Sequence, residues 1–327
     1  MVYSPCLPDG SRGTGSLVGV VGSRMNRDQA KRTALTAARS YGEALRLAVL
    51  WLREAGTLDS PELDAQIVLA HVTQISRPML LAFPERALTP EQAKSYTALI
   101  ERRTAHEPVA YLTGRREFMG LDLLVDSRVL IPRPETELLV ETALAEIAER
   151  IVEDRAPIVA DVGTGSGAIA LALATYQSRL PYLYATDISA GALSLAETNA
   201  VRLGLSDRVI ILQSDLLATL PEPLDVLVAN LPYIARQDAP SLPIDVSRYE
   251  PPGALYGETD GLGHLRRLFQ QAPDHLNPGA AVVLEFGFDQ RASVEALALA
   301  TFPRCILRFG NDYAGWDRYV VIRLPSP

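Results

Sequence analysis

The chain has 327 residues, and at about 150 residues per domain this length predicts two domains. Hydrophobic residues make up 48% and charged residues 21%, which is typical of a soluble globular protein and excludes disordered, collagen-like and coiled-coil classes. The formal charge of −8 argues against a large nucleic-acid footprint, because phosphate binding needs a clustered excess of Lys and Arg.

No apolar stretch approaches the roughly 20 residues that a membrane span requires. Cys6 and Cys305 lie almost a chain length apart without a CxxC spacing, so neither a disulfide framework nor a zinc site is indicated. We therefore expect no metal, no membrane contact and a reducing, cytoplasmic location. The histidines also show no metal-ligand spacing and are interpreted as structural or surface residues: His71, His106, His264 and His275.

Residues 1–24 contain five glycines between Gly10 and Gly22 and no sustained helical or strand period, so a flexible N-terminal extension is predicted. The segment lacks the order of charged start, apolar run and small-residue cleavage site of a signal peptide. Its mildly basic composition leaves an organelle transit peptide open. The favoured interpretation is a true start of translation at Met25.

From about residue 27 to residue 103 the apolar positions follow a helical spacing. Helix starts are indicated at 60–62 and 89–92, where a hydroxyl residue precedes a proline at the first helical position, and Gln92 stands where a capping box needs it. We predict a helical substrate-recognition domain over residues 25–115. A hairpin or linker is predicted over 116–134, with extended segments at 121–125 and 129–131.

After Pro157 the pattern alternates between strands and helices. Such a βαβ series predicts a parallel sheet with helices on both faces, over residues 135–327. The expected strands are 158–162, 182–186, 209–212, 224–229 and 281–286, with a closing hairpin of 305–309 and 318–324. The expected helices are 135–151, 168–176 and 190–203.

Residues 161–167, with the sequence D-V-G-T-G-S-G, follow a predicted buried strand and open a predicted helix. Glycines allow tight turns there and let a ligand approach the backbone. Asp187 ends the next predicted strand, 22 residues after Gly165, where a carboxylate can accept hydrogen bonds from both hydroxyls of a ribose. A further acid, Asp215, ends the strand after that.

This loop could bind either of two cofactors, a dinucleotide or S-adenosylmethionine. The dinucleotide spacing G-x-G-x-x-G/A is satisfied by Gly163, Gly165 and Ala168, but a pyrophosphate gains from an uncharged helix N-terminus. Asp161 instead places an acid at the end of the first predicted strand, which suits the positive sulfur and ammonium group of S-adenosylmethionine. The D-x-G-x-G-x-G order resembles the cofactor loop of class I methyltransferases. A dinucleotide enzyme and a purely structural turn remain the alternatives.

Residues 230–233, Asn-Leu-Pro-Tyr, follow the strand 224–229 at the carboxyl edge of the predicted sheet, where α/β proteins bind ligands. Taken alone, they could form an ordinary turn. After a methyltransferase loop they resemble the [Asn/Asp/Ser]-Pro-Pro-[Tyr/Phe] motif of enzymes that methylate a nitrogen attached to a planar, conjugated group. Leu231 replaces the usual first proline, a form also found in ribosomal-RNA adenine dimethyltransferases.

The chemistry of such a nitrogen explains these residue types. Its lone pair is delocalised, so two hydrogen-bond acceptors on the NH₂ group help to aim the lone pair at the methyl group. Asn230 can supply its side-chain oxygen and Leu231 its backbone carbonyl. Pro232 keeps Leu231 extended, and Tyr233 can stack on the planar group. The candidate catalytic residues are therefore Asn230, Pro232 and Tyr233.

Further short segments are spread over both predicted domains. They are residues 102–103 (RR), 107–114 (EPVAYLTG), 116–118 (REF), 130–137 (LIPRPETE), 249–251 (YEP), 260–261 (DG), 284–287 (LEFG) and 312–315 (DYAG). In combination they resemble the signature of the release factor glutamine methyltransferases (PrmC/HemK family), and the resemblance runs from about residue 35 to the C-terminus.

The resemblance implies an α/β, Rossmann-like class I methyltransferase fold with a seven-stranded sheet and a helical domain that grips the protein substrate. The implied reaction moves a methyl group from S-adenosyl-L-methionine to the side-chain amide nitrogen (N5) of the glutamine in the Gly-Gly-Gln loop of peptide-chain release factors, by a monomer. The implied cofactor residues are Gly163, Thr164, Gly165, Ser166, Gly167, Asp187, Leu216 and Asn230. The implied substrate residues are Asn230, Leu231, Pro232 and Tyr233. Leu216 and Met119 stand where some members have Trp, so the shape of the pocket and of its approach is expected to differ.

Two other classes of function remain. An N6-adenine methyltransferase acting on RNA or DNA is the alternative enzyme, although the acidic balance and the absence of a basic, aromatic N-terminal arm count against it. A non-catalytic binding module is disfavoured by the intact loop and Asn230. No sequence-specific nucleic-acid partner is expected, and the negative charge suits a protein whose glutamine loop is flanked by basic residues. No functional role is assigned to Trp51, Trp316, Glu137 or Glu285.

Overall fold

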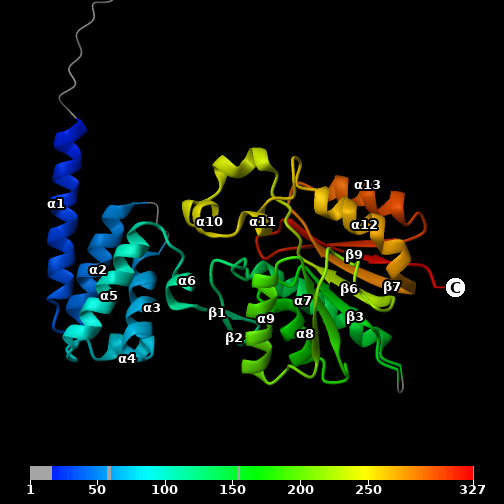
Figure 1. Cartoon of the computed structure of the whole chain (residues 1–327), viewed down its shortest axis with the longest axis horizontal. Helices are drawn as coiled ribbons and strands as arrows, with labels where there is room; N and C mark the ends of the chain where they lie inside the picture. Colours follow the sequence, from blue (N-terminus) through cyan, green and yellow to red (C-terminus); the bar gives the residue numbers. More distant parts are fainter. Residues whose placement is uncertain (1–16, 57–59, 153–154, 327) are drawn as a thin grey trace, which may run out of the picture. The chain divides into compact units, whose positions relative to one another are not determined.

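The computed structural model describes residues 17–56, 60–152 and 155–326. It divides into two compact units, one ending at Leu112 and one beginning at Thr113, and each is described by itself (Figure 1). Most of the extension predicted over residues 1–24 lies outside the described residues. Residues 17–24, however, belong to the helix Leu17–Thr36, which corrects the expectation of a flexible segment there; the segment has no proline, so its backbone can form helical hydrogen bonds throughout. Within the described residues, the structure contains no helix that is both long and apolar enough to cross a membrane.

The N-terminal unit is helical, as expected. Its helices are α1 (Leu17–Thr36), α2 (Tyr41–Ala55), α3 (Pro61–Thr73), α4 (Arg77–Ala82), α5 (Pro90–Thr104) and α6 (Val109–Thr113), the last ending at the boundary between the units. The capping box at the start of α5 is confirmed, since Thr89 and Gln92 each bond the backbone N–H of the other. Helix α3 begins at Pro61 as predicted, but the Ser60 side chain makes no capping hydrogen bond.

The second unit opens with an antiparallel hairpin of β1 (Arg115–Phe118) and β2 (Leu121–Leu124). The predicted segment 121–125 thus contains a strand, but its partner is β1 and not 129–131, which forms no strand. The reason is the two-residue turn at Met119 and Gly120, whose φ angles of 50° and 72° match the twist of a tight hairpin.

A seven-stranded sheet forms the centre of the second unit, in the order β5-β4-β3-β6-β7-β9-β8, which confirms the expected strand number and α/β class. Strands β5, β4, β3, β6 and β7 are parallel, and β9 runs antiparallel to both of its neighbours. The strands are β3 (Val159–Val162), β4 (Leu183–Asp187), β5 (Val209–Gln213), β6 (Leu224–Ala229), β7 (Leu276–Glu285), β8 (Ile306–Asn311) and β9 (Asp317–Arg323).

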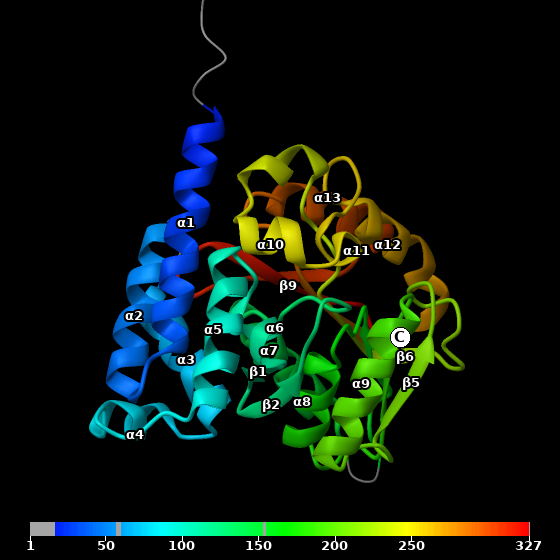
Figure 2. The ribbon, with the colours of Figure 1, turned by 60° about the vertical axis from the view of Figure 1, so that its left-hand side comes forward.

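Helices cover both faces of this sheet (Figures 1 and 2). One face packs against α7 (Glu135–Arg150), α8 (Ala168–Tyr176) and α9 (Ala190–Leu203), and the other against α12 (Gly263–His275) and α13 (Arg291–Thr301). Between β6 and α12 the chain forms three short helices: η1 (Arg236–Ser241), α10 (Ile244–Tyr249) and α11 (Pro252–Leu255).

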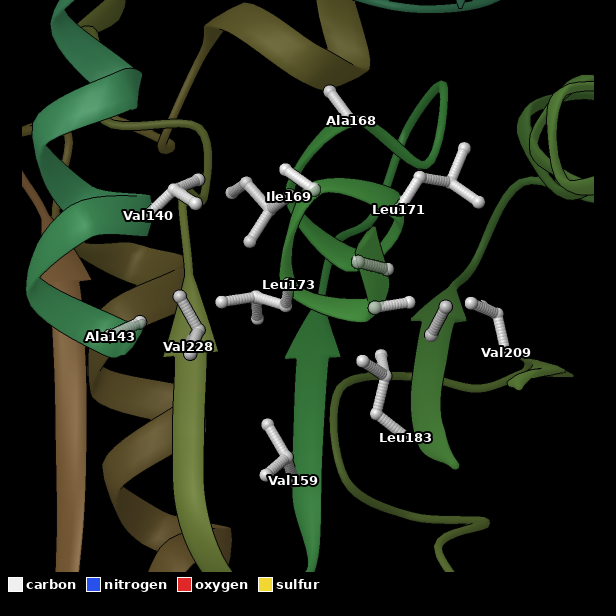
Figure 3. Packing of buried hydrophobic residues seen from close by; sticks show 14 of the residues in the cluster. Val140, Ala143, Val159, Ala168, Ile169, Leu171, Leu173, Leu183, Val209 and Val228 are labelled. Atoms are coloured by element: carbon white, nitrogen blue, oxygen red, sulfur yellow. The ribbon is translucent and has the colours of Figure 1, made fainter. Parts of the chain in front are cut away.

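The alternation of side chains along the strands fills two cores. Val226 and Val228 of β6 point to the cluster under α7 and α8, whereas Leu227 and Ala229 point to the cluster under α12 and α13. Helix α8 is apolar on all sides and is buried from Ala168 to Ala174. Figure 3 shows side chains of the first cluster, among them Ile169 and Leu173 of α8, gathered against the strands.

A buried carboxylate joins α7 to the closing hairpin. Glu146 is fully buried and accepts hydrogen bonds from Arg150 (2.9 Å), from Arg323 of β9 (2.7 Å) and from Arg308 of β8 (3.3 Å). Burial raises the pKa of Glu146, but the hydrogen bonds from Arg323 and Arg150 outweigh it and hold the pKa below its usual value. The carboxylate therefore stays charged and stabilises the packing of α7 on the edge of the sheet.

We expect Glu146→Ala to lower the free energy of unfolding by about 3 kcal/mol, because it leaves a cluster of arginines without their buried partner. The measurement is urea denaturation at pH 7. Glu149→Ala is the matched control, since Glu149 also bonds Arg323 but from an exposed position, and its loss should be about 1 kcal/mol or less. Equal losses in the two variants would contradict the assignment.

Candidate active site

A cavity of about 290 Å³ opens at the carboxyl edge of the sheet. The neighbouring parallel strands β5, β4, β3 and β6 all end at this edge, and residues that follow each of them line the cavity. Of the residues proposed to hold a cofactor, those in the lining are Gly163, Thr164, Gly165, Ser166, Asp187, Leu216 and Asn230. Gly167 is not in the lining and instead forms the N-cap of α8, with φ +84°.

The loop after β3 is held by hydrogen bonds to the end of β4. The backbone N–H groups of Gly163 and Thr164 both donate to the carbonyl of Thr186 at 2.8 Å, and the N–H of Gly165 donates to Oδ2 of Asp187 at 2.9 Å. Gly163 has φ +79°, and a Cβ there would lie 3.0 Å from Cδ2 of Leu231. The positive φ favours glycine at this position, and a larger residue would also have to displace the end of the Leu231 side chain.

Asp161 does not line the cavity, so the structure corrects the expectation that it meets the cofactor's charge. It is fully buried, and its Oδ2 accepts hydrogen bonds from Thr164 Oγ1 (2.6 Å) and from the backbone N–H of Ala170 (3.1 Å). Burial raises the pKa of Asp161 to about 7. Its position connects the glycine loop to the first turn of α8.

Two residues beyond β5 complete this side of the cavity. Asp215, which was expected to end this strand, lies just after its last residue, Gln213, and forms an ion pair with Arg267 of α12. Leu216 has φ +57°, a conformation that costs a bulky residue of order 1 kcal/mol, and its carbonyl accepts a hydrogen bond from Thr186 Oγ1 at 3.3 Å. Its side chain gives this part of the lining an apolar surface.

A second cavity of about 230 Å³ adjoins the first. Asn230, Leu231 and Pro232 line both cavities, so this segment stands between them. Apolar side chains from the stretch that contains η1, α10 and α11, such as Leu242 and Val246, form another part of its wall, and Tyr233 lines it as well. Met119, which was expected to shape the approach to the pocket, lies in the β1–β2 turn and lines neither cavity.

A chain of hydrogen bonds lies behind Asn230. Its Nδ2 donates to Oγ1 of Thr136 at 3.1 Å, and that hydroxyl donates to Oε2 of Glu285 at 2.7 Å. The other carboxylate oxygen, Oε1, accepts a hydrogen bond from the Tyr233 hydroxyl at 3.3 Å. Burial raises the pKa of Glu285 to about 7, whereas hydrogen bonds from Thr136 and Tyr233 and the charge of Arg318 act in the opposite direction.

The sequence pattern alone assigns no role to Glu285 and does not distinguish Thr136 from its neighbours. Both residues stand in segments that resemble the family's signature, 130–137 and 284–287, and that was the only available signal. Another buried carboxylate, Glu250, positions the segment 130–137, since it accepts a hydrogen bond from the N–H of Ile131 at 3.2 Å and pairs with Arg133.

Comparison with known proteins assigns both units to described families. Residues 43–114 match the PrmC N-terminal domain, and residues 136–242 match the methyltransferase small domain. A solved structure titled as the hMettl16 catalytic domain in complex with MAT2A 3'UTR hairpin 6 shares the fold, with a TM-score of 0.52 and 16% identity, over 71% of this chain and 84% of that one.

Several curated relatives carry the name release factor glutamine methyltransferase. The protein from Moorella thermoacetica is 45% identical over 87% of this chain and 97% of its own length, and that from Bordetella pertussis is 46% identical over 79% and 93%. The Escherichia coli K12 protein is 41% identical over 77% of this chain and 90% of its own length. With these identities and coverages, the chain belongs to the family of release factor glutamine methyltransferases, enzymes with a class I methyltransferase domain.

Proposed function

We propose that this chain transfers a methyl group from S-adenosyl-L-methionine to the N5 amide nitrogen of the glutamine in the Gly-Gly-Gln loop of peptide-chain release factors. The observation that carries the proposal is the position of Asn230 and Leu231 between two adjoining cavities. An amide held in the smaller cavity would face a methyl donor in the larger one. The name shared by the full-length relatives supports the same substrate.

The residues of the larger cavity fit S-adenosylmethionine better than a dinucleotide. The N–H groups of Gly163, Thr164 and Gly165 already donate within the protein, so this part of the loop offers them to no pyrophosphate. Asp187 retains lone pairs for the hydroxyls of a ribose, and Leu216 and Ile169 offer apolar surface to an adenine ring. When bound, the cofactor supplies an electrophilic methyl group on a positively charged sulfur.

The residues around Asn230 orient the acceptor amide. Oδ1 of Asn230 and the backbone carbonyl of Leu231 accept hydrogen bonds from the glutamine NH₂ group, which turns the nitrogen lone pair toward the larger cavity. Tyr233 covers the planar face of the amide, because its hydroxyl is held by Glu285. No strong base is needed, since an N-methylated, protonated amide is a strong acid and releases its proton to water.

The same chemistry would serve an exocyclic amino group of adenine. The net charge of −8 disfavours a nucleic-acid substrate, and so does the name of the relatives that cover most of the chain. We therefore propose a release factor as the partner. We further propose a cytoplasmic location and a monomer as the active form.

For cofactor binding we expect Asp187→Asn to weaken the affinity for S-adenosylmethionine about tenfold or more, because the variant loses a charged acceptor for the ribose hydroxyls and a brace of the glycine loop. Isothermal titration calorimetry measures the change. Asp207→Asn is the control, since Asp207 is exposed in the loop before β5 and should leave the affinity unchanged. An unchanged affinity in Asp187→Asn would remove this residue from the cofactor site.

For the reaction we expect wild-type protein to transfer label from methyl-labelled S-adenosylmethionine to a release factor, and mass spectrometry to place the methyl group on the glutamine of Gly-Gly-Gln. A release factor with that glutamine replaced by alanine should take up no label. Asn230→Ala should lose turnover by about a hundredfold or more while binding cofactor in weakened form, because it removes an acceptor for the glutamine NH₂. Label on RNA, or on another residue of the release factor, would overturn the proposed function.

A further inference from the structure

We propose that Thr136 and Glu285 are positioning residues that fix the orientation of the Asn230 side-chain amide, so that its oxygen and not its NH₂ group faces the substrate nitrogen. The inference rests on the proposed function, because only an NH₂ substrate requires an acceptor at this place. It adds a requirement that the Asn-Leu-Pro-Tyr motif itself does not contain.

The direction of the hydrogen bonds follows from counting protons. A hydroxyl carries one proton, and a carboxylate only accepts. When Glu285 is ionised, the proton of Thr136 is used in the 2.7 Å bond to Oε2, and the Thr136 oxygen can then only accept from Asn230. In the structure, Nδ2 of Asn230 is the donor to Thr136 Oγ1, at 3.1 Å, and Oδ1 therefore lies on the other side of the amide. The charge on Glu285 thereby selects one of two amide orientations that have nearly the same shape.

Burial makes the selection effective. Thr136 is 5% exposed and Glu285 6% exposed, so water competes little for these bonds. The three groups come from the start of α7, the end of β7 and the loop after β6, which are fixed by the sheet and its helices. The second oxygen of Glu285 holds Tyr233, so one carboxylate positions both polar side chains of the motif.

A proton on Glu285 reverses this order. A protonated carboxyl can donate to Thr136, whose hydroxyl is then free to donate to Oδ1 of Asn230. The side-chain amide of Asn230 would then rotate, so that its oxygen and its NH₂ group exchange places. Its NH₂ group would then face the NH₂ group of the substrate. The groups that set the charge are Arg318 of β9, which favours the ionised form, and Glu135 of α7, which opposes it, besides Thr136 and Tyr233. Turnover is therefore expected to fall as the pH drops below about 7.

The first test compares Thr136→Val with Thr136→Ser. Valine keeps the shape but removes the hydroxyl, so kcat should fall about tenfold or more, while the Kd for S-adenosylmethionine and the KM for the release factor change by less than about threefold. Serine restores the hydroxyl and should recover most of kcat. A kcat of Thr136→Val equal to that of wild type overturns the proposal. A Thr136→Ser variant that is folded but has a kcat as low as that of Thr136→Val also overturns it.

The second test is the pH profile of kcat between about pH 6 and 8.5 at saturating substrates. Wild type should lose activity on the acid side, and Glu285→Gln, which cannot ionise, should give a flat profile at a lower level. Glu137→Gln is the matched control, because Glu137 lies on the same first turn of α7 but bonds the N–H of Met119. It should keep the wild-type profile. A wild-type slope in Glu285→Gln overturns the proposal.

A third readout needs neither cofactor nor substrate and so separates a failure of this inference from a failure of the proposed function. The NMR signals of the Asn230 side-chain NH₂, assigned by their loss in Asn230→Ala, should shift between pH 5.5 and 8.5 in the wild-type protein and stay constant in Glu285→Gln. Signals that do not respond to pH in the wild type overturn the inference, whatever the enzyme methylates. An absence of methyl transfer together with a normal NMR titration overturns only the proposed function.

Discussion

The site depends on the parallel pairing of β3 with β4 on one side and β6 on the other. Strands β4 and β5 lie on one side of β3 in the sheet, whereas β6 and β7 lie on the other side. Ligands bind in α/β sheets at the position where the strand order reverses in this way. The glycine loop follows directly after β3 and Asn230 directly after β6, whereas Asp187 is the last residue of β4. Gly163 and Leu231 illustrate this constraint, because a Cβ at position 163 would lie 3.0 Å from Cδ2 of Leu231, so the loop after β3 and the segment after β6 approach each other closely.

The site also concentrates buried carboxyl groups. Burial raises the pKa values of Asp161 and Glu285 to about 7, unlike that of Glu146, which arginines hold low. A raised folded-state pKa contributes stability that is complete below about pH 4 and is lost as the pH rises through about 7. Asp161 beneath the glycine loop and Glu285 behind Asn230 therefore lower the stability of the folded protein at the pH where the proposed role of Glu285 requires its ionised form.

Elements with a strong local signal were predictable from the sequence. Helices α8 and α9 and strand β6 begin and end at the predicted residues, because apolar runs are bounded there by Gly167, Gly204 and Asn230. Strand β1 was missed because its pairing depends on the turn at Met119, and helices η1, α10 and α11 were missed because they are too short for a periodic pattern. The link from Thr136 to Glu285 spans 149 residues, and only the fold brings the two together.

The proposed function requires that Asn230 and Leu231, which line both cavities, hold the amide nitrogen of the substrate. Its most direct test is a crystal structure with S-adenosylhomocysteine and a peptide that contains Gly-Gly-Gln. We expect the glutamine NH₂ within hydrogen-bond distance of Oδ1 of Asn230 and of the carbonyl of Leu231, with the sulfur of the cofactor product in the larger cavity. A glutamine bound elsewhere, or one whose carbonyl oxygen faces Asn230, would contradict it.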